Sequence, residues 1–287
     1  MNDQASKLRA LARGQVPESP LFRSRVMAIT SGKGGVGKTN VVAGLAIALS
    51  NMGQKVVVLD ADFGLANIDI LLGLTPTHTL EHVLRGEKVL EEIMVEGPNG
   101  IRVIPASSGI QELTRLDAAS ELRLIQGLQR VAEGQDWLLI DTAAGIHDSV
   151  IKLIMAAQEI VLVTTPEPTS LVDAYAMVKV VHLRDATKPI WLLINNSQTE
   201  TEAEETIEQL QAATLRFLGR ELQVLGMIPS DAHVLQAVRQ QRSVVDLYPR
   251  SPAAIAFQSI ASQVLKKVPL QRDGFASFWR QLSIEEP

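Results

Sequence analysis

The chain has 287 residues, of which 46% are hydrophobic and 21% are charged, with a formal net charge of -5 at pH 7 and no cysteine. This length suits one large α/β domain or two average domains, and the absence of thiols excludes disulfides, cysteine zinc sites, thiolate-bound iron–sulfur clusters and cysteine nucleophiles. The negative charge disfavours overall attraction to nucleic acid, no apolar run is long enough to span a membrane, and the N-terminus lacks the apolar core of a secretory signal. We therefore expect a cytoplasmic protein.

The first 25 residues differ from those that follow. They carry an excess of basic side chains and end in a break between Pro17 and Pro20. This composition is typical of a short helical stub on a linker. A disordered basic tail is the alternative that the residues leave open.

From Val26 onward, short β-branched apolar runs alternate with longer segments of helical periodicity. Seven runs are predicted to be strands: 26–30, 55–60, 101–104, 137–141, 160–164, 190–195 and 222–228. Continuously apolar strands separated by helices are typical of a parallel sheet that is buried on both faces. We predict a single doubly wound α/β domain over 26–267, with about seven mainly parallel strands and helices on both faces.

A cluster of glutamates follows the predicted strand 190–195. A helix should begin there, and carboxylates favour the positive end of the helix dipole. A solvated first turn therefore explains the cluster, with an acidic binding surface as the alternative; its members are Glu200, Glu202, Glu204, Glu205 and Glu208.

A glycine-rich segment follows the first predicted strand. Residues 32–39 read GKGGVGKT and satisfy the pattern G-x-x-x-x-G-K-[ST], before a helix that we expect to begin at Asn40. Such a loop presents backbone N–H groups to phosphate oxygens, and the helix N-terminus adds partial positive charge. Lys38 should contact the β and γ phosphates, and the Thr39 hydroxyl should ligate Mg²⁺. The predicted nucleotide-binding residues are Gly32, Lys33, Gly34, Gly35, Val36, Gly37, Lys38, Thr39 and Asn40.

Acidic residues follow two other predicted strands. Asp60 and Asp62 lie at the end of the second strand, and Asp141 lies at the end of the fourth. The carboxyl ends of parallel strands form the ligand-binding edge of an open α/β sheet, so these acids should lie near the phosphate loop. Carboxylates there can hold a metal or position water for phosphoryl transfer. For Asp60 and Asp141, capping of the next helix is the alternative.

The second lysine in the loop, Lys33, makes KGGVGKT a deviant Walker A motif. The chain here resembles the MinD/ParA/nitrogenase-iron-protein superfamily of dimerising nucleotide switches. The resemblance implies that Lys33 reaches across a face-to-face homodimer to the partner's ATP, so that dimerisation is linked to nucleotide state. It also implies that Asp62 positions the attacking water, that Asp60 holds the hydration shell of the metal, and that Asn67 orders the switch.

The resemblance extends to the fourth strand and to a base site. Asp141 resembles a Walker B acid that reaches Mg²⁺ through water, and Gly145 would allow switch II to approach the γ phosphate. Asn195 stands where relatives hold an asparagine against adenine, with a turn asparagine as the alternative. The segment 226–231 matches a loop whose backbone lines the adenine ring, through Ile228 and Pro229.

The absence of cysteine narrows this superfamily, because the nitrogenase-type reductases and the iron–sulfur carriers need thiolate ligands. ParA-type segregation ATPases bind DNA through basic surfaces. The last third of this chain carries five such arginines, Arg216, Arg220, Arg239, Arg242 and Arg250. Acidic residues lie among them, which favours a solvated mixed face and no direct DNA binding. A DNA segregation ATPase and a metabolic enzyme with this phosphate loop remain the alternatives.

The C-terminal segment 268–287 carries apolar side chains at helical spacing. They follow an i, i+3, i+4, i+7 pattern, with basic residues nearby, and are Phe275, Phe278, Trp279 and Leu282. Such a helix suits an anionic membrane surface, and MinD-like relatives end in one. Two copies on an ATP dimer would bind much more tightly than one, so membrane residence would depend on ATP. A helix packed on the protein's own core is the alternative.

The N-terminal element DQASKLR, residues 3–9, resembles the DQAxxLR element of the MinD-like flagellar number regulators FlhG, FleN or YlxH. The similarity continues through LDADFGLANIDILLGL, DTAAGIHDSV, PEPTSLVDAYA and YPRS, and so covers nearly the whole chain. It implies that the segment 1–25 stimulates the GTPase FlhF through Asp3, Gln4, Ala5, Leu8 and Arg9. The flagellar transcription activator and the C-ring switch proteins are partners of some members.

These features together predict a Mg²⁺-dependent, homodimerising ATPase that regulates the number and placement of flagella. We expect it to alternate between the cytoplasm and the inner face of the cell membrane, near the pole.

Overall fold

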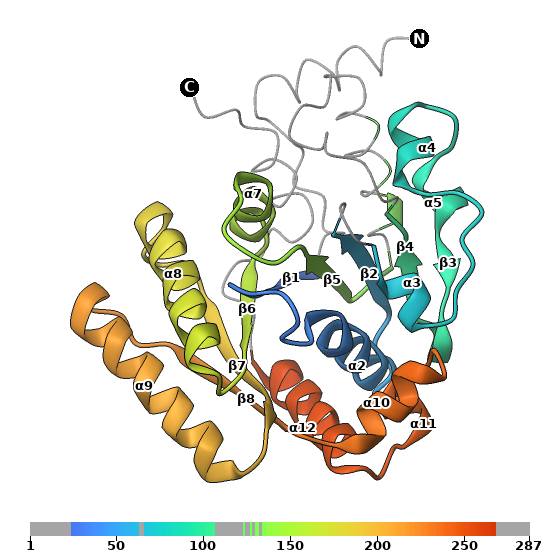
Figure 1. Ribbon diagram of the computed structural model, residues 1–287. Coiled ribbons are helices and arrows are strands. Elements are labelled where there is room, and N and C mark those ends of the chain that lie inside the picture. Colours follow the sequence, from blue (N-terminus) through green and yellow to red (C-terminus); the bar gives the residue numbers. More distant parts are fainter. Residues whose placement is uncertain are drawn as a thin grey trace.

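The computed structural model describes residues 24–62, 66–106, 123, 127, 130, 131 and 134–267. Within these residues an eight-stranded sheet runs through the centre (Figure 1), in the order β3-β4-β2-β5-β1-β6-β7-β8. Neighbouring strands are parallel, except for the β3–β4 pair. The strands are β1 (Arg25–Thr30), β2 (Val56–Ala61), β3 (Val95–Glu96), β4 (Arg102–Ile104), β5 (Trp137–Thr142), β6 (Glu159–Thr164), β7 (Ile190–Ser197) and β8 (Gln223–Pro229).

The predicted mainly parallel, doubly wound sheet is confirmed, but the described part has eight strands instead of seven. The additional strand, β3, pairs antiparallel with β4, placing Val95 opposite Val103. Two residues are too few to show an alternation of apolar and polar side chains. This strand depends on the 3₁₀ turn at Pro98–Gly100, which folds it back against β4.

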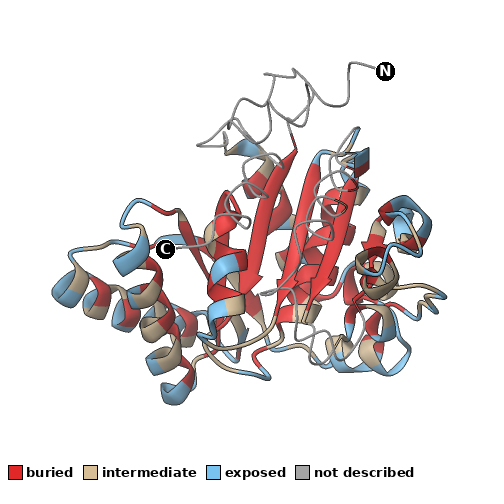
Figure 2. Cartoon of the chain, turned by 90° about the horizontal axis from the view of Figure 1, so that it is seen from above, coloured by how far each residue is buried: buried red, intermediate tan, exposed pale blue. Residues whose placement is uncertain are grey.

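Helices cover both faces of the sheet, and Figure 2 shows the buried strands between them. Successive residues of β1 contribute to opposite cores: Val26 and Ala28 belong to one, and Met27 and Ile29 to the other. The first core includes residues of α4 (Leu80–Leu84), α5 (Leu90–Ile93), α7 (Asp148–Ala156), α8 (Pro168–Arg184) and α9 (Glu200–Leu218). The second includes residues of α2 (Lys38–Asn51), α3 (Ile68–Leu71), α10 (Ala232–Arg239), α11 (Val244–Leu247) and α12 (Pro252–Lys266). None of the described helices combines the length and apolar character that a membrane span requires.

The glutamate cluster lies on α9, as expected. The Thr199 hydroxyl caps this helix by accepting the N–H of Glu202 at 3.1 Å, and Glu200 and Glu202 lie in the first turn. Glu204, Glu205 and Glu208 are exposed along the same helix. The first-turn explanation therefore holds for Glu200 and Glu202, and the other three glutamates lie on the solvated face further along the helix.

A buried ion pair joins the two ends of the domain at the amino edge of the sheet. Arg25, at the start of β1, makes a bidentate contact with Glu159 of β6, at 2.7 and 3.0 Å. The same guanidinium donates to the carbonyls of Val264 and Lys267, at the end of α12, and lies over the Trp137 ring. The start of β1 and the end of α12 are therefore held together.

Candidate nucleotide-binding site

The phosphate loop connects β1 to α2 at the carboxyl edge of the sheet. Gly35 and Gly37 have left-handed backbone conformations, with φ values of 80° and 90°. The N–H of Val41 donates to the carbonyl of Gly37 at 3.0 Å, which closes the first turn of α2. The helix therefore begins at Lys38, two residues before the predicted start at Asn40, because Gly37 already caps it.

Close contacts with neighbouring elements restrict two of the loop glycines. A Cβ on Gly32 would lie 2.2 Å from the carbonyl oxygen of Asp173 in α8, and a Cβ on Gly37 would lie 2.4 Å from the Asn195 amide nitrogen. Gly34 and Gly35 face open space instead. The loop is thus held between α8 and β7, which the motif alone does not predict.

Asp60 organises the segment after β2. Its buried carboxylate accepts the backbone N–H groups of Asp62, Asn67 and Ile68, at 3.1, 3.1 and 3.3 Å. In this structure the Asp60 carboxylate therefore caps the start of α3, which is the alternative role considered for it. Its role in the metal's hydration shell stays a prediction. Burial, and then the charge of Asp141, raise the pKa of Asp60 to about 7.

Asp141 lies directly beside Asp60, because the two residues are partners across the β2–β5 pair. Its carboxylate accepts a hydrogen bond from the Thr39 hydroxyl and lies near Lys38, but burial dominates and raises its pKa to about 6. His147 precedes α7, so Asp141 does not cap that helix. Its Oδ1 atom is buried and has no hydrogen-bond partner among the described residues.

This unpaired oxygen supports a metal site at Asp141 and Thr39. A buried carboxylate oxygen without a partner is costly unless a ligand satisfies it. The described residues contain no group of three or more His, Cys, Asp or Glu side chains that could hold a metal. Mg²⁺ in nucleotide sites needs few protein ligands, because waters and phosphates supply the others. The residues therefore fit a hydrated Mg²⁺ shared with a nucleotide.

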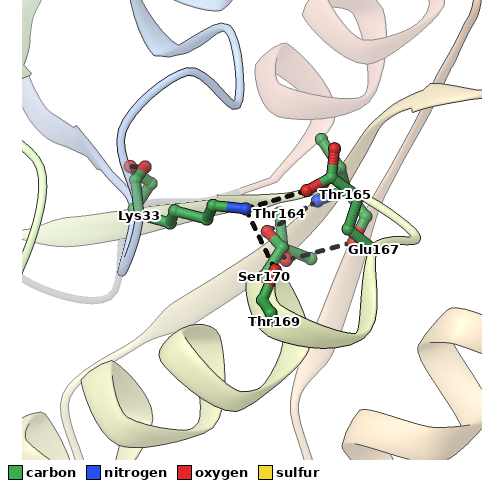
Figure 3. A network of polar contacts seen from close by, with 7 residues as sticks. Lys33, Thr164, Thr165, Glu167, Thr169 and Ser170 are labelled. Carbon is green, nitrogen blue, oxygen red and sulfur yellow. Dashed lines mark hydrogen bonds and ion pairs between the residues drawn. The ribbon is translucent and has the colours of Figure 1, made fainter.

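Lys33 contacts its own chain (Figure 3). Its ammonium group donates to the Glu167 carboxylate at 2.8 Å and to the Thr169 hydroxyl at 3.0 Å, at the start of α8. The loop lysine therefore lies on the surface of its own subunit in this structure. Its contact with a partner's nucleotide stays a prediction.

The remaining switch residues lie around the loop. The half-buried Asp62 is close enough to Asp141 for its charge to raise the pKa of that carboxyl. Asn67 is exposed directly before α3. Gly145 has a φ of 92°, and its N–H donates to the carbonyl of Ser31 at 2.9 Å, so switch II is attached to the phosphate loop. The approach of Gly145 to the γ phosphate stays a prediction.

A pocket of about 760 Å³ extends from the loop to the end of β8. Asn195 lines it from β7, and its amide nitrogen donates to the Val36 carbonyl at 2.7 Å. Asn195 pairs with Ile228 of β8, and the left-handed residue at the irregularity that follows within β7 is Asn196, so Asn195 is not a turn asparagine. Ile228 and Pro229 also line the pocket, and their contact with adenine stays a prediction. Further apolar lining comes from Val234, Leu235 and Val238 of α10 and Phe257 of α12. The sequence carries no motif that identifies these four residues, because their spacing along the chain is also that of ordinary buried core residues.

Two sets of predicted residues lie outside the described part of the chain. They are the partner residues Asp3, Gln4, Ala5, Leu8 and Arg9 and the membrane residues Phe275, Phe278, Trp279 and Leu282. Their roles stay predictions.

Comparison with known proteins agrees with this geometry. Residues 23–265 match the ParA family model, described as NUBPL iron-transfer P-loop NTPase. The chain is 42% identical to the antiactivator FleN of Pseudomonas aeruginosa, covering 92% of this chain and 94% of the relative. It is 33% identical to the flagellum site-determining protein YlxH of Helicobacter pylori, covering 98% of each chain.

Solved MinD structures share the fold. The cell division ATPase MinD of Pyrococcus furiosus superimposes with a TM-score of 0.70 at 27% identity, covering 85% of this chain and 99% of that one. MinD of Pyrococcus horikoshii, solved with Mg-ADP, gives 0.68 at 28% identity, covering 84% and 96%. The iron transfer in the family description does not extend to this chain, which has no cysteine. The phosphate loop, the buried acids beside it and these similarities place the chain in the ParA/MinD family of P-loop ATPases, together with FleN and YlxH.

Proposed function

We propose that this protein is an ATP-dependent switch that dimerises with ATP, binds the cell membrane, and controls the number and placement of flagella. The kinship with FleN and YlxH supports the flagellar role. The observation that carries the switch itself is the pair formed by Thr39 and the buried, half-satisfied Asp141 directly beside the phosphate loop. This pair provides an incomplete site that a nucleotide with its metal would complete.

Each residue has a separate part in the proposed hydrolysis. Lys38 and the loop N–H groups bind the phosphates, while Thr39 and Asp141 hold the Mg²⁺. Mg²⁺, when bound, neutralises charge that develops on the phosphates. Asp62 orients the attacking water, and Asp60 keeps the segment that carries Asp62 in place through its backbone hydrogen bonds.

Exposed apolar side chains around the site support the proposed dimer face. Ile70, Ile146 and Val172 are 57%, 49% and 68% exposed. They follow β2, β5 and β6, so all three belong to segments that leave the carboxyl edge of the sheet. Large exposed apolar side chains on segments that leave the same edge of a sheet suit an interaction surface. We infer that a second copy of this chain covers them when ATP is bound.

The contacts of Lys33 are compatible with exchange between subunits. Its ion pair with Glu167 is exposed to solvent, and exposed pairs contribute only about 0.2–1 kcal/mol. A stronger contact with phosphates would therefore release Lys33 from α8. In the proposed dimer the lysine then reaches the nucleotide of the partner subunit.

The contacts of the arginines in the last third weigh against a DNA-binding surface. Arg220 donates to the carbonyl of Lys188, Arg242 pairs with Asp246, and Arg216 lies over the Phe217 ring. Three of the five arginine side chains are thus engaged in polar or ring contacts within their own chain. We propose that the C-terminal segment provides membrane contact instead, and that the N-terminal segment stimulates an FlhF-type GTPase.

Liposome co-sedimentation tests this proposal. The full chain should sediment with anionic vesicles in Mg-ATP, and much less with ADP or without nucleotide. The double variant Phe278→Glu with Trp279→Glu should lose this binding but retain ATP hydrolysis, because none of the predicted nucleotide-binding residues belongs to the segment 268–287. Salt-sensitive retention on duplex DNA with ATP, without vesicle binding, would favour the segregation ATPase instead.

A further inference from the structure

Two helix starts meet at one carboxylate beside the proposed base pocket. Asp231 lies between β8 and α10, lines the pocket, and has a side chain that is only 4% exposed. The helices that begin beside it, α10 and α12, supply the apolar wall of the pocket through Leu235, Val238 and Phe257. The position of this wall therefore depends on how the two helix starts are held.

Asp231 caps both helices. One carboxylate oxygen accepts the N–H of His233, in the first turn of α10, at 2.9 Å, and lies 2.7 Å from the ring nitrogen Nδ1 of the same residue. The other oxygen accepts the N–H of Ala253, in the first turn of α12, at 3.1 Å. Ser251, which caps α12, also hydrogen-bonds Asp231. Burial acts to raise the pKa of Asp231, but these hydrogen bonds outweigh it and the pKa is lowered.

Helix α12 packs against α2, the helix that follows the phosphate loop. A Cβ on Gly44, in the middle of α2, would lie 2.7 Å from the Phe257 ring, so α12 packs directly on the helix that begins at Lys38. Asp231 joins α10 to α12, and Phe257 joins α12 to α2. The apolar wall is therefore held at a defined position relative to the phosphate loop.

We propose that Asp231 is a positioning residue for the nucleotide base. By capping α10 and α12 together, it fixes the wall formed by Leu235, Val238 and Phe257, and so sets the affinity for the base end of the nucleotide. The inference depends on ATP as the ligand of this pocket, which is part of the proposed function. The carboxylate is satisfied by helix N–H groups, so its own role is to hold helices and not to contact phosphate.

A comparison of two ligands tests this role. Isothermal titration calorimetry would measure the binding of Mg-ATP and of Mg-tripolyphosphate, which lacks base and ribose, to the full chain. Asp231→Ala should weaken ATP binding by up to roughly tenfold, because part of the binding energy must then order the two helix starts, and should change tripolyphosphate binding less than about twofold. The KM for ATP should rise correspondingly, with kcat at saturation retained.

Two further variants separate this role from a general loss of stability. Leu235→Ala removes a wall side chain that is largely exposed, so it should fold normally and show the same ATP-selective loss. Asp185→Ala is the matched control, because Asp185 accepts the N–H of Thr187 at 2.8 Å before β7, at the opposite edge of the sheet. It should bind both ligands as the wild type does.

The outcomes distinguish the inference from the proposed function. Equal weakening of both ligands in Asp231→Ala, or unchanged ATP affinity in either Asp231→Ala or Leu235→Ala, would overturn the positioning role. A wild-type chain that binds no Mg-ATP would overturn the proposed function itself.

Discussion

Asp60 and Asp141 are buried side by side at the end of β2 and β5, and both have raised pKa values. Each carboxyl binds its proton more tightly in the folded chain than in the unfolded chain. The stability that this contributes is fully present below about pH 4 and is lost as the pH rises through 6 and 7. Mg²⁺ competes with the same protons, so its affinity should increase over that range.

Urea unfolding at several pH values checks this linkage. Without nucleotide or Mg²⁺, the wild-type free energy of unfolding should fall between pH 5 and 7.5, by about 1.4 kcal/mol for each pKa unit involved. Asp60→Asn removes one of the two titrating groups and should flatten this fall. The linkage is contradicted if the variant and the wild type show the same dependence on pH.

Asp62 is predicted to act on water, and it is separable from the groups that bind nucleotide. Asp62→Ala leaves Lys38, Thr39 and Asp141 in place, so it should bind ATP but release phosphate at least about a hundredfold more slowly. Because ATP persists, the variant should accumulate as a dimer in size-exclusion chromatography. Asp148→Ala removes an exposed acid near switch II and serves as the control. A monomeric Asp62→Ala with ATP bound would refute the assignment.

At the scale of elements, sequence patterns predicted the strands and loops whose conformation depends on residues close together in the chain. The seven longer strands and the strand–loop–helix context of the phosphate site follow from apolar runs and glycine spacing. Helix α2 begins at Lys38, earlier than predicted, because Gly37 caps it. Strand β3 was not predicted because only its pairing with β4 makes this short segment a strand. The walls from α10 and α12 were missed because tertiary contacts, through Asp231 and Gly44, bring them to the pocket.

Arg25 provides a test of stability at this scale. Arg25→Ala leaves Glu159 buried without its partner and frees the end of α12 from β1. Loss of one member of a buried pair costs about 3–5 kcal/mol, and urea unfolding should show a decrease of that size. Arg85→Ala breaks an exposed pair with Glu81 on α4, and should change stability by less than about 1 kcal/mol. Equal effects of the two variants would show that the buried pair does not hold these elements together.

At the scale of the whole molecule, the amino and carboxyl edges of the sheet have different roles. The amino edge joins the start of β1 to the end of α12, and the carboxyl edge carries the phosphate loop, the buried acids and the exposed Ile70, Ile146 and Val172. The fold and the loop could be predicted from the sequence. The contacts of Lys33 with Glu167 and Thr169 could not, because a long lysine side chain can reach several acceptors and only the packing of α8 places these two within reach.

The central claim, a dimer controlled by ATP, is tested most directly by light scattering during size-exclusion chromatography. With Mg-ATP the chain should have twice the monomer mass, and with Mg-ADP the mass of one chain. Val172→Asp places a charge on the proposed dimer face, outside the nucleotide contacts, and should remain monomeric with both. An unchanged wild-type mass with bound ATP and with bound ADP would contradict the account.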